Sequence, residues 1–157
     1  MKSQLLTYLA PMFVTNTRNN AYSGTFYCDQ GDIGITQSFA IDVINQIDLN
    51  SIFGVPGNSY KYFEGCLSTS QTGNQYCCQV AYLSSDGVEG TVTMTANGDS
   101  TGADAGGGID TGYDIYGIAS GIFRQCWTNN NDLHSGRWAG TGEYGGNFQI
   151  GLSGGTC

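Results

Sequence analysis

Four aspartates lie in the glycine-rich stretch of residues 97–114, where their carboxylates could bind a hard cation. Ca²⁺ takes about six to eight oxygen ligands from carboxylates and carbonyls on flexible backbone, and this stretch is rich in both. The spacing fits neither an EF-hand loop nor a repeating calcium-binding nonapeptide. A solvated loop between strands explains the stretch as well, so we expect no cofactor, with calcium as the alternative. The candidate ligands are Asp99, Asp104, Asp110 and Asp114.

His134 is the single histidine of the chain, and it lies in a polar run over residues 129–136. A Ser–His–Asp triad could use it as a base, but no G-x-S-x-G elbow or other nucleophile signature accompanies it. One histidine also cannot form a multi-histidine metal centre. A pair of carboxylates could serve a glycoside hydrolase, but the sequence does not give their separation. We therefore expect His134 to be a loop residue and name no catalytic residue; the equally eligible carboxylates are Glu64, Glu89, Asp110, Asp114 and Glu143.

Three aromatic residues in the C-terminal third could form a sugar-binding platform. Trp127, Trp138 and Tyr144 lie among glycines and asparagines. Exposed rings stack on sugar faces, and nearby amides and carboxylates can bind hydroxyl groups. Tryptophan is also a common core residue because it buries a large apolar area. Both interpretations stay open at the level of sequence, so a glycan is a possible partner.

Six cysteines, an even number, lack the paired spacing of a zinc site and are expected to form disulfides. Disulfides persist in oxidising compartments, which indicates an extracellular or cell-surface location. Cys77 and Cys78 are neighbours, and neighbouring side chains of a strand point to opposite faces. We therefore expect them to bond in different directions, and a bond at Cys157 would hold the C-terminal end in place. The pairing stays open among Cys28, Cys66, Cys77, Cys78, Cys126 and Cys157.

The elements that would position these residues are mostly short strands. Residues 76–97 show two alternating apolar runs around Asp86-Gly87, which predicts a β-hairpin with a threonine-rich solvent face. Residues 38–49 fit either a helix or a strand, and their β-branched content favours a strand. Further strands are predicted at 25–28, 37–43, 60–67, 113–119, 122–128, 136–139 and 147–152. Glycine-rich turns separate nearly all of them.

This pattern predicts an all-β fold. Short strands with turn residues between them, and no long helical period, favour a disulfide-stapled antiparallel sandwich or barrel with at most one short helix. The length of 157 residues matches one domain, which we expect to span residues 15–157.

Residues 1–14 form an apolar N-terminal segment. It faintly resembles a secretory leader, but Pro11 interrupts the run and no clean cleavage site follows. It is also too short to span a membrane. We expect it to be buried against the core or to act as a strand between subunits, through Leu5, Leu6, Tyr8, Leu9, Met12, Phe13 and Val14.

The charge composition excludes two classes of partner. The chain has a formal net charge of −8 and only five lysines and arginines. Nucleic acids and anionic membranes are bound largely through basic side chains, so neither is expected as a main partner.

Low charge, abundant glycine and small polar residues, disulfides and an apolar N-terminal segment together favour a structural role. We expect an extracellular, non-catalytic protein that assembles with copies of itself into a filament, sheath or surface layer, with strand addition by residues 3–14 as the mechanism. A secreted carbohydrate-binding module or lectin is the first alternative. A small secreted glycoside hydrolase is the second.

Overall fold

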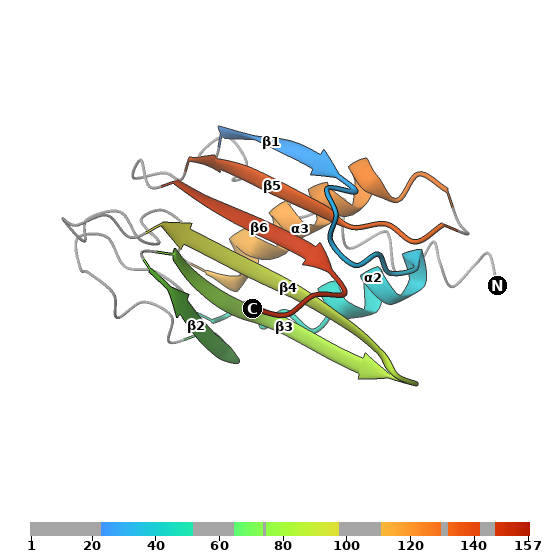
Figure 1. The fold of residues 1–157 in the computed structure, drawn as a ribbon, viewed down its shortest axis with the longest axis horizontal. Coiled ribbons are helices and arrows are strands. Elements are labelled where there is room, and N and C mark those ends of the chain that lie inside the picture. Colours follow the sequence, from blue (N-terminus) through green and yellow to red (C-terminus); the bar gives the residue numbers. More distant parts are fainter. Residues whose placement is uncertain (1–22, 52–64, 74, 98–110, 130–131, 142–146) are drawn as a thin grey trace.

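The computed structural model describes residues 23–51, 65–73, 75–97, 111–129, 132–141 and 147–157. Within these ranges the chain forms six strands and two helices (Figure 1). In chain order they are β1 (Ser23–Cys28), α2 (Gln37–Ile44), β2 (Ser68–Thr72), β3 (Gln75–Ser85), β4 (Val88–Asn97), α3 (Gly112–Cys126), β5 (Gly136–Thr141) and β6 (Asn147–Ser153).

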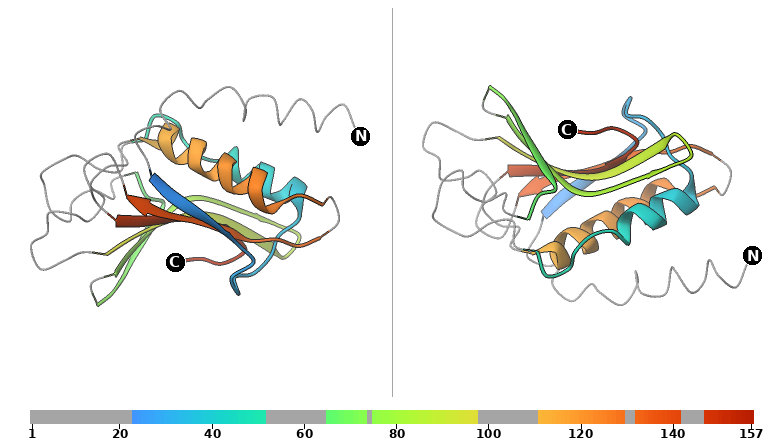
Figure 2. Two further views of the ribbon diagram at one scale, coloured as in Figure 1. Left: turned by 90° about the horizontal axis from the view of Figure 1, so that it is seen from above. Right: turned by 90° about the horizontal axis from the view of Figure 1, so that it is seen from below.

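The strands form one antiparallel sheet with the order β1-β5-β6-β4-β3-β2. Helices α2 and α3 lie side by side against one face of the sheet, and the C-terminal residues cross the other face (Figure 2). The expected antiparallel, disulfide-stapled and mostly β fold is confirmed. The apolar face of this sheet is covered by two helices, however, where we expected a second sheet or a closed barrel.

The predicted hairpin is confirmed as β3 and β4. Ser85 pairs with Val88 across a two-residue turn. Asp86 and Gly87 both have positive φ angles, 53° and 76°, as the favoured type I′ turn requires. The threonine-rich face is not simply solvent-exposed, because Thr91 is buried and its hydroxyl donates a hydrogen bond to the Gly155 carbonyl.

Three other predicted strands are also confirmed. Residues 25–28 lie in β1, residues 136–139 in β5 and residues 147–152 in β6. Most of the predicted strand 60–67 lies outside the described residues, and β2 begins just after it at Ser68. The polar sequence of β2 carries no apolar alternation, which is why it was not predicted.

The strand predicted over residues 37–43 is wrong, because this segment is helix α2. The Thr36 side chain accepts a hydrogen bond from the Phe39 N–H group at 3.3 Å, which satisfies one of the free donors of the first turn. Ala40, Val43 and Ile44 are buried at helical spacing against the sheet. Burial of this stripe outweighs the strand preference of the β-branched residues.

The strands predicted over residues 113–119 and 122–128 are also wrong, because nearly all of this region is helix α3. Thr111 precedes the helix, and its hydroxyl donates a hydrogen bond to the Asp114 carboxylate at 3.1 Å. Twelve of the fifteen residues of α3 are buried, so the helix is apolar on most sides. A helix buried all round lacks the one-sided stripe that identifies surface helices.

The core lies between the helices and the sheet. On the sheet side it is formed by alternate residues of the central strands, including Val92, Met94, Ile150 and Leu152. Close approach is possible where the sheet carries glycine: a Cβ at Gly90 would lie 2.6 Å from Val43 Cγ2 and 2.7 Å from Phe39 Cε1. We call this side the helix face.

The opposite side of the sheet is the polar face. The strand register places on this face, among others, Cys77, Gln79, Glu89, Thr91, Thr93, Thr95, Arg137, Ala139, Gln149, Gly151 and Ser153.

Candidate functional site

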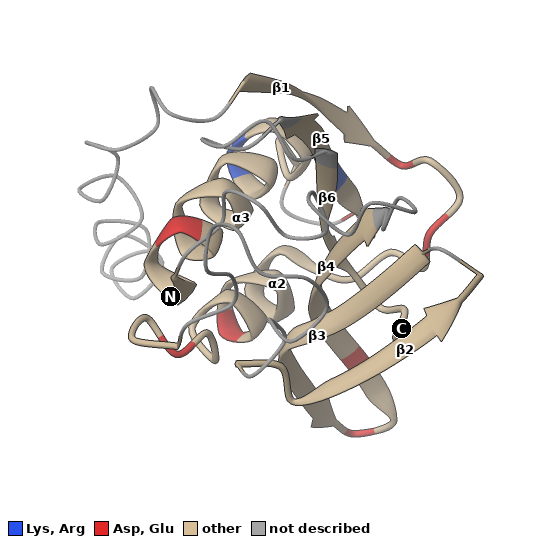
Figure 3. Ribbon diagram, turned by 90° about the vertical axis from the view of Figure 1, so that its left-hand side faces the viewer, with Lys and Arg blue, Asp and Glu red and all other residues tan. Residues whose placement is uncertain are grey.

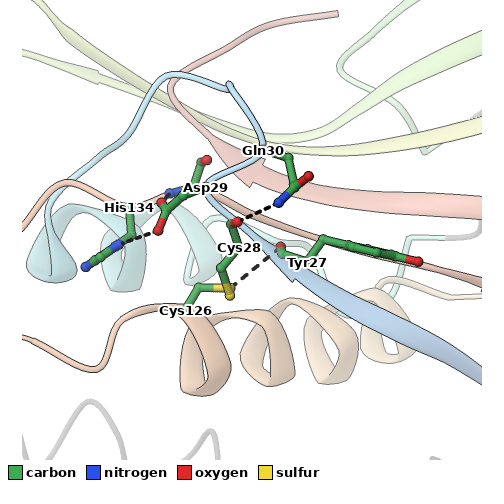
Figure 4. Close-up of a disulfide and its surroundings, with 7 residues drawn as sticks. Tyr27, Cys28, Asp29, Gln30, Cys126 and His134 are labelled. Carbon is green, nitrogen blue, oxygen red and sulfur yellow. Dashed lines mark hydrogen bonds and ion pairs between the residues drawn. A yellow bond between two sulfur atoms is a disulfide. The ribbon is translucent and has the colours of Figure 1, made fainter.

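Asp29 and His134 form a hydrogen-bonded pair 105 residues apart in the sequence (Figure 4). Asp29 has a positive φ of 55° directly after β1, a conformation that aspartate tolerates better than most residues. Its carboxylate turns back toward the segment before β5. One oxygen lies 2.9 Å from His134 Nδ1, and the other accepts the Ser135 N–H group at 3.0 Å. These two hydrogen bonds hold the pKa of Asp29 below its ordinary value.

Among the described residues, no serine, threonine or cysteine side chain is hydrogen-bonded to the free nitrogen of His134. His134 Nε2 is buried and has no hydrogen-bond partner within the described residues. The Ser135 side chain follows His134 directly, and its hydroxyl is likewise buried and unpaired there. The pair therefore fixes the loop after β1 to the segment before β5, next to the disulfide between Cys28 and Cys126.

All six cysteines form disulfides, as expected. The expectation that Cys77 and Cys78 bond in different directions is confirmed. Cys78 points into the core on the helix face, whereas Cys77 lies on the polar face and bonds to the last residue, so the C-terminus is held there. The three pairs are Cys28–Cys126, Cys66–Cys78 and Cys77–Cys157.

Both tryptophans lie in the core. Trp127 is 3% exposed and Trp138 is 4% exposed. The Trp127 indole N–H group donates to the Ile35 carbonyl at 3.0 Å, and its ring stacks on Phe123. Neither indole therefore presents an open face to a sugar ring. Tyr144, the third residue of the predicted platform, lies outside the described residues.

Of the four candidate calcium ligands, Asp114 is described, and Asp99, Asp104 and Asp110 lie outside the described residues. Asp114 is buried in the first turn of α3 and bonded to Thr111. A carboxylate there interacts favourably with the helix dipole. Within the described ranges no three His, Cys, Asp or Glu residues cluster as a metal site would require.

A groove lies at the end of the sheet where β3 turns into β4. Its volume is about 560 Å³, within the range of about 300–1,000 Å³ that is usual for ligand sites. Apolar side chains form much of the lining, and three of them are open to solvent: Ile33 is 66%, Val88 45% and Leu133 63% exposed. The described lining also contains the acids Asp86 and Glu89 and no basic residue. We call it the hairpin groove.

The walls of the hairpin groove are held in place by backbone hydrogen bonds. Ile35 and His134 exchange two of them, at 2.8 and 3.1 Å, and the Gly154 N–H group donates to the Ile33 carbonyl at 2.8 Å. The sequence did not reveal this groove because its lining comes from four segments that are far apart in the chain, namely residues 33–39, residues 85–89, Leu133 and Gly154. The one local signal was the pair of apolar residues, Ile33 and Leu133, in otherwise polar loops.

The two edges of the sheet form a second notable surface. Within the described residues, β1 and β2 each pair with a strand on one side only, and nearly all of their residues are exposed. Neither strand contains a charged residue or a proline, which are common protections of strand edges. The described charges are scattered over helices, loops and inner strands, with Arg124 on α3, Glu89 on β4 and Arg137 on β5 (Figure 3).

The assembly segment predicted from the sequence, from Leu5 to Val14, lies outside the described residues. Neither α2 nor α3, the two described helices, has the length and apolar character needed to cross a membrane. Comparison of the chain with protein-family models, curated proteins and solved structures found no match.

Proposed function

We propose that this chain is an extracellular, non-catalytic structural subunit that packs with copies of itself in a filament, sheath or surface layer. The observation that carries the proposal is the pair of sheet edges, β1 and β2, which within the described residues are exposed, uncharged and paired on one side only. An exposed strand edge offers a row of backbone donors and acceptors to another chain. Pairing of such edges between copies would extend the sheet from one subunit to the next.

The disulfides and the composition support the same role. Three disulfides in one small domain are typical of proteins that work in an oxidising environment. The scarcity of charge leaves uncharged polar side chains along β2, and small side chains together with the exposed rings of Phe26 and Tyr27 along β1. Such side chains allow close packing of subunits without the repulsion that like charges would cause.

The apolar N-terminal segment, residues 3–14, is the proposed donor between subunits. Main-chain hydrogen bonds give affinity when an extended segment is added to a neighbour, and its alternate side chains give specificity. Deleting residues 1–14 should leave a soluble monomer. Unchanged assembly after this deletion, seen by negative-stain electron microscopy, would exclude the segment as donor.

Lysine substitutions on β1 and β2 test whether these exposed edges mediate association between copies. Thr25→Lys on β1 combined with Ser70→Lys on β2 places a charge on each exposed edge and should suppress lateral association. Gln149→Lys is the matched control, because Gln149 is exposed on the central strand β6. Assemblies of normal width from the edge variant would refute the proposed role of the edges.

A further inference from the structure

The hairpin groove and the start of β1 lie at opposite ends of the sheet. Ser23 pairs with Thr141, and Cys28 at the other end of β1 pairs with Gly136. The register continues across β6 to β4, so that Gly136 is aligned with Leu152 and Leu152 with Val92. The hairpin groove lies beyond the Cys28 end, and the chain that precedes Ser23 joins the molecule at the other end.

The groove is lined in a way that favours an apolar segment with a positive charge. Its exposed apolar residues, Ile33, Val88 and Leu133, lie beside the acids Asp86 and Glu89. Glu89 accepts a hydrogen bond from the Tyr82 hydroxyl at 2.8 Å, which raises the pKa of Tyr82. Among the described residues, the lining contains no lysine, arginine or histidine that would balance these acids.

Residues 1–22 have the complementary character. They contain two bases, Lys2 and Arg18, and no acid, whereas the rest of the chain has three bases and thirteen acids. Lys2 is followed closely by Leu5, Leu6, Tyr8 and Leu9. A volume of about 560 Å³ suits a few such side chains rather than the whole segment.

The geometry points to a second copy of the chain as the source of this segment: we infer that residues 2–9 of one subunit bind in the hairpin groove of the next. A tail that leaves at Ser23 must run back along the whole sheet to reach its own groove. If subunits stack end to end, the Ser23 end of one sheet faces the groove end of the next. The thirteen residues 10–22 can span up to ~45 Å when extended, so the connection has ample length.

This contact joins two different surfaces and is therefore heterologous. Repetition of a heterologous contact builds an open chain of subunits when the rotation does not close a ring. The inference rests on the proposed function, self-assembly, and adds an axial contact to the lateral contacts of the edges. The preformed walls of the groove reduce the entropy lost on binding.

A complementation experiment with the full-length chain tests the inference. Leu133→Glu blocks the groove, and Leu9→Glu blocks the inserted segment. Both changes are made in the Thr25→Lys/Ser70→Lys edge variant, which lacks the lateral contact. Each should then give a monomer at concentrations where the edge variant still assembles end to end, because each weakens the axial contact at least about tenfold by burying an unpaired charge. Mixed in equal amounts they should form a dimer, since the first still donates its segment and the second still accepts one. Sedimentation velocity measures both results.

Matched variants separate a groove effect from a general surface effect. Leu49 is 41% exposed and lies outside the groove, so Leu49→Glu should assemble like the parent. Ile33→Glu is a second groove variant and should behave like Leu133→Glu. Near-ultraviolet circular dichroism and the absence of free thiols verify the fold of each variant.

Two results would overturn the inference in different ways. Normal assembly of both groove variants would exclude the groove as acceptor and leave the proposed function in place. A parent chain that stays monomeric would overturn the proposed function together with the inference, including the case in which the segment occupies the groove of its own molecule.

Discussion

The two faces of the sheet are built from the same strands but are stabilised in different ways. On the helix face, Val92, Met94 and Ile150 are fully buried beneath α2 and α3. On the polar face, Thr91 is buried by the C-terminal residues, and the Cys77–Cys157 disulfide holds those residues in place. The helix face is thus stabilised by apolar packing. On the polar face, a hydrogen bond and a disulfide hold the C-terminal residues over part of the sheet.

Neighbouring residues show how sharply the faces differ. Cys77 and Cys78 follow each other in β3, yet one is linked to the C-terminal tail and the other to Cys66 in the core cluster. We therefore expect apolar packing on the helix face to contribute most of the free energy of unfolding.

The largest expected difference between the faces is in the free energy of unfolding lost on alanine substitution of two adjacent residues of β6. Ile150→Ala removes a fully buried side chain and should lower the free energy of unfolding by about 2–5 kcal/mol. Gln149→Ala on the polar face should change it by less than about 0.5 kcal/mol. Guanidinium denaturation of both variants measures the difference, and equal effects would contradict the assignment of the faces.

A smaller difference is expected between two glycines of the sheet. Gly90→Ala places a methyl group 2.6 Å from Val43 Cγ2, and overpacking of this kind costs about 1–3 kcal/mol. Gly151→Ala meets the Thr93 hydroxyl at 2.8 Å on the polar face, and that hydroxyl can rotate away. Its effect on the unfolding free energy should stay below about 0.5 kcal/mol. A Gly90→Ala variant as stable as the parent would show that α2 is packed less closely than described.

The smallest effect on the free energy of unfolding is expected at the Asp29–His134 pair, which joins the loop after β1 to the segment before β5. The folded-state pKa of Asp29 lies below its ordinary value of 3.8, so the pair stabilises the fold above that pH and loses this contribution as the pH falls through the folded-state pKa. Because Asp29 is half exposed, the contribution is at most about 1 kcal/mol. As the pH is lowered from 6 to 3, the urea concentration at the unfolding midpoint should fall less in Asp29→Asn than in the parent. Asp42→Asn, at an exposed position, is the control and should decline like the parent.

The sequence predicts local features of this fold well. The hairpin of β3 and β4 follows from the alternation of its side chains and from Asp86-Gly87, both of which act over a few residues. The opposite bonding of Cys77 and Cys78 follows from the geometry of a strand. These predictions need no knowledge of distant parts of the chain.

The helices were misread because their residues favour strands by intrinsic preference. In α3, Ile115, Ala119 and Ile122 recur at helical spacing, and Thr111 with Asp114 forms a start signal. The β-branched and aromatic residues between them obscured that pattern. The two helices also cover the apolar side of the sheet, which must be buried against another layer.

The candidate sites depend on contacts between distant segments. Asp29 meets His134 across 105 residues, and the hairpin groove combines the loop after β1, the β3–β4 turn and Leu133. No spacing rule connects residues so far apart in one sequence. What the sequence did supply was the apolar character of residues 1–14.

The molar mass of the full chain as a function of concentration is the most direct test of self-assembly. Light scattering should show a mass that rises above the 16.6 kDa of one subunit as the concentration increases and returns to it when residues 1–14 are deleted. A mass that stays at one subunit at every concentration would contradict the account.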